Sequence, residues 1–157
     1  MKILVDSGVS DGTTLAAAAL HDTIEDTKTT FEELVSNFGV AVAKVVQECS
    51  DDKKLPKAER KKLQIEKAKT VSKEARLVKM ADKLSNLSGL QSDPPKDWTP
   101  EYIKGYALWS HMVVSSMNGD PDDANYTRLQ LTVLQVAKNI VDGDKNITLE
   151  SFLELCK

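Results

Sequence analysis

The chain has 157 residues, of which 41% are hydrophobic and only 5% aromatic, so it can form one domain with an aliphatic core. Its net charge of −3 does not favour general nucleic-acid binding, and its two distant cysteines, Cys49 and Cys156, exclude a disulfide framework or a thiolate zinc site. Because no run of 18 apolar residues and no signal-peptide pattern occurs, we expect an intracellular, cytoplasmic protein without a membrane partner.

The first third of the chain contains three predicted helices. The first has weak start signals and runs through an Ala/Leu stretch, whereas the second begins at a capping-box pattern formed by Thr30 and Glu33. Gly39 separates the second helix from a Val-rich third. The expected ranges are about 14–22, 30–38 and 40–49.

The most informative residues of the chain follow the first of these helices. His21 and Asp22 come directly after the apolar run 15–20, where a lone carboxylate would be costly without a partner. An imidazole and a carboxylate presented together are good ligands for a divalent metal. Glu25 and Asp26 lie four residues beyond them, so on a continuous helix each pair shares a face. The pattern predicts a metal site with proton acceptors beside it.

The rest of the chain also has helical patterns. Pro56 begins a lysine-rich helix, Ser72 caps a helix with a clear core stripe, and Thr99 followed by a proline is a strong start signal. Two further helices are expected at about 124–141 and after Thr148. Between residues 53 and 79 there are eleven Lys and Arg against three Glu, a local basic segment that favours an anionic partner such as phosphate.

Asp82 is the best candidate for a further metal ligand. It lies mid-helix beside the stripe of Leu77, Met80 and Leu84, where an aspartate needs a partner. Asn86 follows one turn later on the same side, where it could bind a substrate group. The alternative for Asp82 is an ion pair with a neighbouring lysine.

Three motifs in order resemble the HD-domain hydrolases of the RelA/SpoT type, and most closely the small single-domain enzymes of animals. The similarity runs from near residue 1 to about residue 117. The motifs are His21-Asp22-Thr23-Ile24-Glu25-Asp26-Thr27, Asp51-Asp52-Lys53-Lys54-Leu55-Pro56-Lys57, and Leu77-Val78-Lys79-Met80-Ala81-Asp82-Lys83-Leu84-Ser85-Asn86-Leu87.

The resemblance implies an activity and a set of site residues. It implies hydrolysis of guanosine-3′,5′-bis(diphosphate) at the 3′-diphosphate, releasing pyrophosphate, and it is also associated with removal of the 2′-phosphate of NADPH. The roles it implies are one manganese ion (Mn²⁺) held by His21, Asp22 and Asp82, catalysis by Glu25 and Asp26, and nucleotide contacts from Asn86, Tyr106, Lys53 and Lys57.

The chain also departs from the pattern of the family. The family has one more metal-binding histidine, followed by proline, in a helix upstream of the His-Asp pair, whereas His21 is the first histidine here. We therefore expect an N-terminally shortened form. The alternative is a catalytically impaired remnant of the fold that acts as a binding or regulatory protein.

The overall expectation is an all-α fold, an HD-domain helical bundle lacking its first helix. Residues 1–118 are expected to form the HD-type domain, and residues 119–157 a divergent helical extension packed on it. The tail segment 142–153 superficially resembles a calcium-binding EF-hand loop, but Ile147 and Leu153 occupy the places of the required glycine and glutamate. We therefore expect no calcium binding.

Overall fold

The computed structural model describes residues 1–157 and is entirely helical, as predicted. None of its helices is both long enough and apolar enough to cross a membrane. The helices are α1 (Lys2–Asp6), α2 (Gly12–Leu20), α3 (Thr23–Asp26), α4 (Phe31–Phe38), α5 (Val40–Cys49), α6 (Lys57–Lys67), α7 (Lys73–Ser92), α8 (Pro100–Ser115), α9 (Ala124–Val141) and α10 (Leu149–Leu155).

Side-chain caps fix most of the helix starts. Asp11 accepts a hydrogen bond from the Thr14 backbone N–H at the start of α2, and the predicted capping box of Thr30 and Glu33 forms at α4. Thr99 caps α8 in the same way, with a proline in its first turn. These caps satisfy N–H groups that have no partner within the helix.

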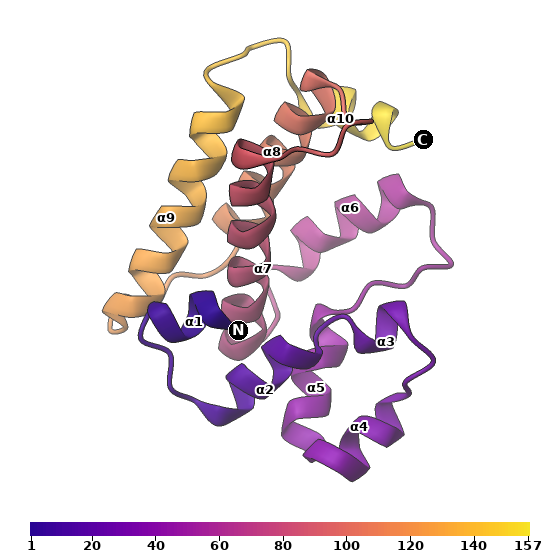
Figure 1. Ribbon diagram of the computed structural model, residues 1–157, viewed down its shortest axis with the longest axis vertical. Helices are drawn as coiled ribbons and strands as arrows, with labels where there is room; N and C mark the ends of the chain where they lie inside the picture. Colours follow the sequence, from indigo (N-terminus) through magenta and orange to yellow (C-terminus); the bar gives the residue numbers. More distant parts are fainter.

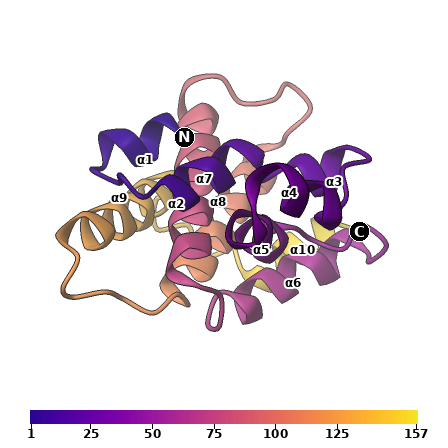
Figure 2. The ribbon, with the colours of Figure 1, turned by 90° about the horizontal axis from the view of Figure 1, so that it is seen from below.

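The longest helix, α7, lies at the centre of the molecule. Figure 1 shows it between α9 on one side and α6 on the other, with α2 and α5 beneath. Viewed from below, α1 and α9 lie on one side of α7, and α3 to α6 on the other (Figure 2). Helix α7 contacts α1, α2, α5, α8 and α9. Its fully or nearly fully buried apolar residues are Ala75, Leu77, Val78, Met80, Ala81, Leu87 and Leu90.

The chain breaks between α2 and α3, close to the expected end of the first helix at about residue 22. Helix α2 ends at Leu20, and the Thr23 hydroxyl donates to the Leu20 carbonyl at 2.7 Å, which competes with the helical hydrogen-bond pattern. His21 and Asp22 form the junction. His21 and Glu25 therefore do not lie on one continuous helix, and the prediction that this pair shares a helical face is wrong. Asp22 and Asp26 do lie one helical turn apart, because Asp22 is the N-cap of α3 and its carbonyl accepts a hydrogen bond from the Asp26 N–H at 2.8 Å.

The C-terminal helices pack on the same core. Helix α9 contacts α7 and α8, and α10 contacts α8 and α6. At the crossing of α8 and α10, a methyl group on Gly105 would come within 2.6 Å of the Phe152 ring, so only glycine fits there without a shift. Residues 119–157 thus bury part of the helices that carry the candidate site.

Candidate metal and nucleotide site

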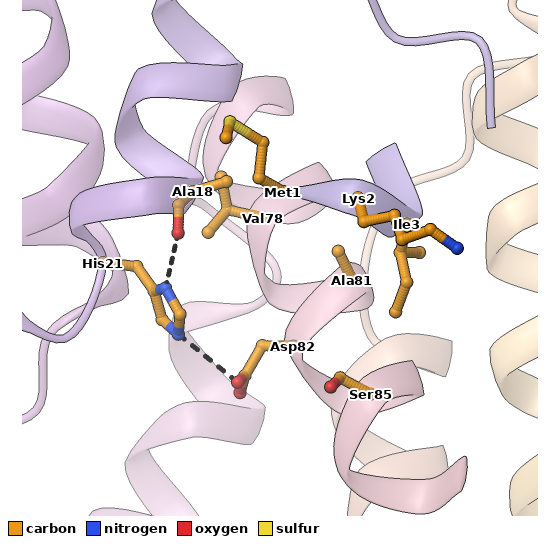
Figure 3. A pocket seen from close by; sticks show the side chains of 9 residues that line it. All are labelled: Met1, Lys2, Ile3, Ala18, His21, Val78, Ala81, Asp82 and Ser85. Carbon is orange, nitrogen blue, oxygen red and sulfur yellow. Dashed lines mark hydrogen bonds and ion pairs between the residues drawn. The ribbon is translucent and has the colours of Figure 1, made fainter. Parts of the chain in front are cut away.

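His21 and Asp82, distant in sequence, meet between α2 and α7. The His21 Nδ1 atom donates to the Ala18 carbonyl at 2.8 Å, which fixes the orientation of the ring. The His21 Nε2 atom then lies 3.4 Å from an Asp82 carboxylate oxygen (Figure 3). It also lies 3.2 Å from a carboxylate oxygen of Asp22. No lysine is within ion-pairing distance of Asp82, so the alternative of a lysine pair is not what the structure shows.

The buried Nε2 atom of His21 has no well-formed hydrogen bond. When Nδ1 carries the proton of a neutral imidazole, Nε2 is an acceptor, and it faces two carboxylates that also only accept. That arrangement is repulsive unless a positive species lies among the three groups. In the metal-free protein this species is a proton, because contact with Asp82 raises the pKa of His21 to about 9.

The same three groups fit a divalent cation. Adjacent donors of an octahedral site with bonds of about 2.1 Å lie about 3 Å apart, close to the 3.2 and 3.4 Å from Nε2 to the two carboxylates. No three His, Cys, Asp or Glu side chains already converge as a finished metal cage, so the fit rests on these pairwise distances and on the unsatisfied nitrogen.

Burial alone would raise the pKa of the Asp82 carboxyl group. The contact with His21 and the charges of Lys83 and Lys79 outweigh burial and hold that pKa below its ordinary value. Asp82 is therefore ionised at neutral pH and remains a good ligand for a cation.

Glu25 and Asp26 both contact the segment that joins α5 to α6. A Glu25 carboxylate oxygen accepts a hydrogen bond from the Asp51 backbone N–H at 2.5 Å, and Asp26 forms an ion pair with Lys53. Glu25 is half-buried, whereas Asp26 is exposed. The structure thus holds Glu25 by one oxygen and leaves its other oxygen without a protein partner.

A chain of hydrogen bonds continues from Glu25 into the core. The Asp51 carboxylate accepts from the Gln64 side-chain amide at 2.5 Å, and the Gln64 carbonyl oxygen accepts from the Lys83 ammonium at 3.3 Å. Gln64 lies on α6 and Lys83 follows Asp82 on α7. This connection between the candidate acid/base residue and the helix of the candidate metal ligand was not predicted.

Of the remaining predicted residues, Asn86, Tyr106 and Lys57 lie where α6 and α7 face α8. The Asn86 side-chain amide donates to the Tyr106 hydroxyl at 3.0 Å, so these two are brought together. Lys57 donates to the Tyr102 hydroxyl at 2.5 Å and lies 5.0 Å from the centroid of that ring. Lys53 is engaged with Asp26 and not with the residues of α8.

Two other lysines occupy this interface more deeply than the predicted ones. The Lys61 and Lys83 ammonium groups lie 3.6 and 3.8 Å from the centroid of the Trp109 ring. Burial lowers the pKa of Lys83 to about 7 and that of Lys61 to about 8. The available sequence signal was the position of Lys83 within the core stripe of α7, one residue after Asp82.

An all-helical bundle in which a His-Asp pair meets an aspartate from a central helix has the defining arrangement of an HD domain. The sequence pattern of the HD domain matches residues 1–108, and the chain belongs to this family.

Several relatives are named guanosine-3′,5′-bis(diphosphate) 3′-pyrophosphohydrolase. Those of Xenopus tropicalis and Homo sapiens are 47% and 46% identical over 73% of this chain, and that of Danio rerio is 48% identical over 75%. The chain spans only 64 to 66% of the length of these relatives.

Two solved structures share the fold. One is described as a metazoan ortholog of SpoT that hydrolyses ppGpp; it has a TM-score of 0.78 and 42% identity, covering 88% of this chain and 75% of its own. The other, a protein of Listeria monocytogenes, has a TM-score of 0.75 and 26% identity, covering 90% of this chain and 94% of its own. The predicted fold and family are confirmed.

Proposed function

We propose that the protein is a metal-dependent phosphohydrolase that removes the 3′-diphosphate of guanosine-3′,5′-bis(diphosphate) and releases pyrophosphate. The single observation that carries the proposal is the unsatisfied Nε2 atom of His21 between the carboxylates of Asp22 and Asp82. Membership of the HD-domain family supports a divalent metal there. The names of the relatives supply the substrate class.

His21, Asp22 and Asp82 are the residues that would hold the cation. When bound, a divalent cation supplies Lewis-acid stabilisation of the negative charge on the phosphate oxygens. We assign manganese as the preferred ion, as the resemblance to the family implies. NADPH, the other substrate that the resemblance implies, is a secondary candidate for the same site, where its 2′-phosphate would be removed.

Glu25 is the proposed proton acceptor for the attacking water. Its one oxygen is held by the Asp51 N–H, so the other oxygen has a fixed direction and is free to accept a proton. Asp26 lies on the same short helix and, through its ion pair, fixes Lys53 nearby. Lys53 and Lys57 would place positive charge close to the phosphates, and Asn86 with Tyr106 would contact the nucleotide.

The test is release of pyrophosphate from guanosine-3′,5′-bis(diphosphate) by the purified chain with manganese. Glu25→Gln is expected to lower turnover by at least about 100-fold, the usual scale for a general base. Asp82→Asn is expected to lower it at least as much, because it removes a ligand of the metal ion. Glu32→Gln is the matched control, because Glu32 is exposed on α4 and outside the site. Turnover that survives Asp82→Asn would contradict the proposal.

Manganese titration of the metal-free chain separates an enzyme from a catalytically impaired binding protein. One ion bound per chain, lost in Asp82→Asn but not in Glu25→Gln, is expected, because Glu25 does not contact His21 or Asp82. Absence of both binding and turnover would favour the alternative, a remnant of the fold that acts as a binding or regulatory protein.

A further inference from the structure

An open cavity of about 320 Å³ lies beside the start of α8, a volume within the usual range of ligand pockets. The cavity is next to the proposed nucleotide contacts, because the ring centroid of Trp98, which lines it, lies 5.5 Å from that of Tyr106. Tyr106 in turn contacts Asn86, one helical turn beyond Asp82. The residues that line the cavity are Lys57, Asp97, Trp98, Thr99, Tyr102 and Leu155.

Two aromatic rings line this cavity. The centroids of Trp98 and Tyr102 lie 4.6 Å apart, and the ring planes meet edge to face at 71°. Both side chains are half-buried, so part of their surface is packed in the protein and part is left accessible. Because a nucleobase presents a flat π-face to an aromatic side chain, such rings favour a planar ring as the ligand.

The C-terminal helix supplies a further part of the lining. Leu155, at the end of α10, is 51% exposed, although the helix that carries it packs on α8 and α6. A single exposed leucine is ordinary, but this one lines a cavity together with two aromatic rings. Leu155 also lies beyond residue 108, where the match to the HD domain ends, so this contact comes from outside the matched region.

The cavity contains one carboxylate and one ammonium group, and the two do not pair with each other. Lys57, the only cation in the lining, donates to the Tyr102 hydroxyl and not to Asp97. A carboxylate only accepts hydrogen bonds, and it repels the phosphates of a nucleotide. In a nucleotide site, Asp97 therefore has to face donor groups of the ligand. Guanine presents two N–H donors side by side on its Watson–Crick edge, whereas adenine has an acceptor at the ring position.

We propose that this cavity binds the guanine base of the nucleotide, stacked against Trp98 and Tyr102, with Asp97 accepting from the N1 and N2 donors of the base. As the place of the base of the substrate, the cavity rests on the proposed function; binding of a guanine nucleotide does not. The 2′-phosphate of NADPH is carried by the ribose of adenine, which lacks this pair of donors. The chain should therefore prefer guanine nucleotides to NADPH.

The experiment measures binding of guanosine, inosine and adenosine 5′-diphosphate to the full chain by calorimetry. The three ligands share their ribose and phosphates and differ only in the base. EDTA is present throughout, so that no metal contributes and no turnover occurs. Guanosine diphosphate should bind at least about tenfold more tightly than adenosine diphosphate, the scale of one charge-assisted hydrogen bond. Inosine diphosphate, which keeps the N1 donor and lacks the amine, should lie between them.

Asp97→Asn should reduce the preference for guanine over adenine by about tenfold, because the amide replaces one acceptor oxygen by a donor. Asp93→Asn is the matched control, since Asp93 is exposed in the same loop and does not line the cavity. Both positions are exposed, so unfolding temperatures equal to that of the parent chain would show that the fold is intact.

Leu155→Ala tests the contribution of α10. It should weaken binding of all three nucleotides by about threefold, the scale of a partly buried aliphatic side chain, without changing the preference among them. Leu131→Ala, at an exposed leucine of α9 outside the cavity, should bind as the parent chain does.

The outcomes distinguish this inference from the proposed function. Absence of binding, equal affinity for the three nucleotides, or a guanine preference that persists in Asp97→Asn overturns the inference, even if the chain hydrolyses guanosine-3′,5′-bis(diphosphate). If the guanine preference is present and is lost in Asp97→Asn, but manganese supports no hydrolysis, the base site stands and the proposed function fails.

Discussion

Gln64 is the residue through which the candidate acid/base group is connected to the core. Its amide nitrogen contacts Asp51, whose N–H in turn holds Glu25, and its carbonyl oxygen contacts Lys83. One side chain therefore influences both the direction of a carboxylate and the solvation of a buried ammonium. The contribution is one of position, since Gln64 itself contacts neither His21 nor Asp82.

Gln64→Leu should lower kcat by about tenfold with little change in KM, because misplacing a catalytic group affects the transition state more than ground-state binding. It should also lower the free energy of unfolding by about 1–3 kcal/mol, the cost of a buried donor left without its partner. Steady-state kinetics and urea unfolding measure the two effects. Gln47→Leu, on the exposed face of α5, is the control, and equal kinetics in both variants would contradict the assignment.

Lys73 has a different role, because it joins the start of α7 to the start of α9. Its ammonium lies 2.7 Å from an Asp120 oxygen and 2.8 Å from one of Asp123. These contacts hold the pKa of both carboxyl groups below its usual range and raise that of Lys73. A carboxyl group with a lowered pKa stabilises the folded state above its unfolded pKa, and this contribution is lost as the pH falls through the folded value.

The unfolding temperature should therefore fall as the pH is lowered from about 5, where unfolded aspartates begin to bind protons. Lys73→Met should reduce that acid-side slope, since both carboxyl groups return toward their ordinary pKa. Thermal unfolding followed by circular dichroism from about pH 5 down to about pH 2 measures it, because that range covers the unfolded pKa of aspartate and the lowered pKa values of the folded state. Lys69→Met, which removes only the exposed pair with Glu66, should leave the slope unchanged.

At the scale of helices, the glycines of α7 and α8 differ in the space around them. Gly105 of α8 faces the buried Phe152, and a methyl group there would lie 2.6 Å from the ring. Gly89 of α7 has nothing within 4 Å of the same position. Both are helix-interior glycines, so they share the intrinsic cost of glycine relative to alanine.

Gly105→Ala should destabilise the protein by about 1–3 kcal/mol, because overpacking against a buried ring outweighs the gain in helix propensity. Gly89→Ala should stabilise it by about 0.5–1 kcal/mol, since nothing opposes that gain. Urea unfolding of the two variants provides the comparison. A stabilising Gly105→Ala would mean that α10 does not pack on α8 as described.

At the scale of the whole molecule, the C-terminal helices cover the helices that carry the site. Tyr126, Leu129, Val133 and Ala137 of α9 are buried, all but Leu129 completely so. Fully burying one such aliphatic side chain contributes about 1.5–3 kcal/mol. Most folded proteins of this size are stable by only about 5–15 kcal/mol in total.

Truncation after residue 118 should therefore abolish cooperative unfolding. Removing α9 and α10 exposes the apolar surface of α7 and α8 that they bury. Circular dichroism melting and a dye that binds exposed apolar surface would both report the change. Deleting Lys157 alone, an exposed terminal residue, is the control. A truncated chain that unfolds cooperatively near the temperature of the full chain would contradict this view.

The sequence predicted the fold where local chemistry decides it, and not where tertiary contacts do. Thr30 and Thr99 start helices through their own side chains, so they could be recognised in advance. The break after Leu20 involves the Thr23 hydroxyl, which donates to the Leu20 carbonyl. A threonine competes only weakly with the backbone for such a carbonyl, so the sequence gives no clear sign that the helix ends there. Lysine is usually a surface residue, so the sequence gives no reason to expect Lys83 to be buried. Its burial follows from its contacts with Trp109 of α8 and Gln64 of α6.

The proximity of His21 to Asp82 could be predicted, because each ended or interrupted an apolar stretch and needed a partner. The contact of Asp26 with Lys53 could not, since it depends on how the segment after α5 turns back toward α3. The metal and catalytic roles of these residues stay predictions until the variants are measured.

The weak anchorage of α6 has a dynamic consequence. Helix α6 has no fully buried side chain. It is attached through the partly buried Ala58 and Ile65, a hydrogen bond from the Trp109 indole N–H to the Lys61 carbonyl, and ammonium groups over aromatic rings, so it loses less buried surface on detaching than α7 would. Its amide protons should exchange with solvent sooner than those of α7, at a fraction of the free energy needed to unfold the whole chain. Each such opening would briefly expose Trp109 and Lys83 to water, so the interior of the protein is reached by way of a loosely held helix.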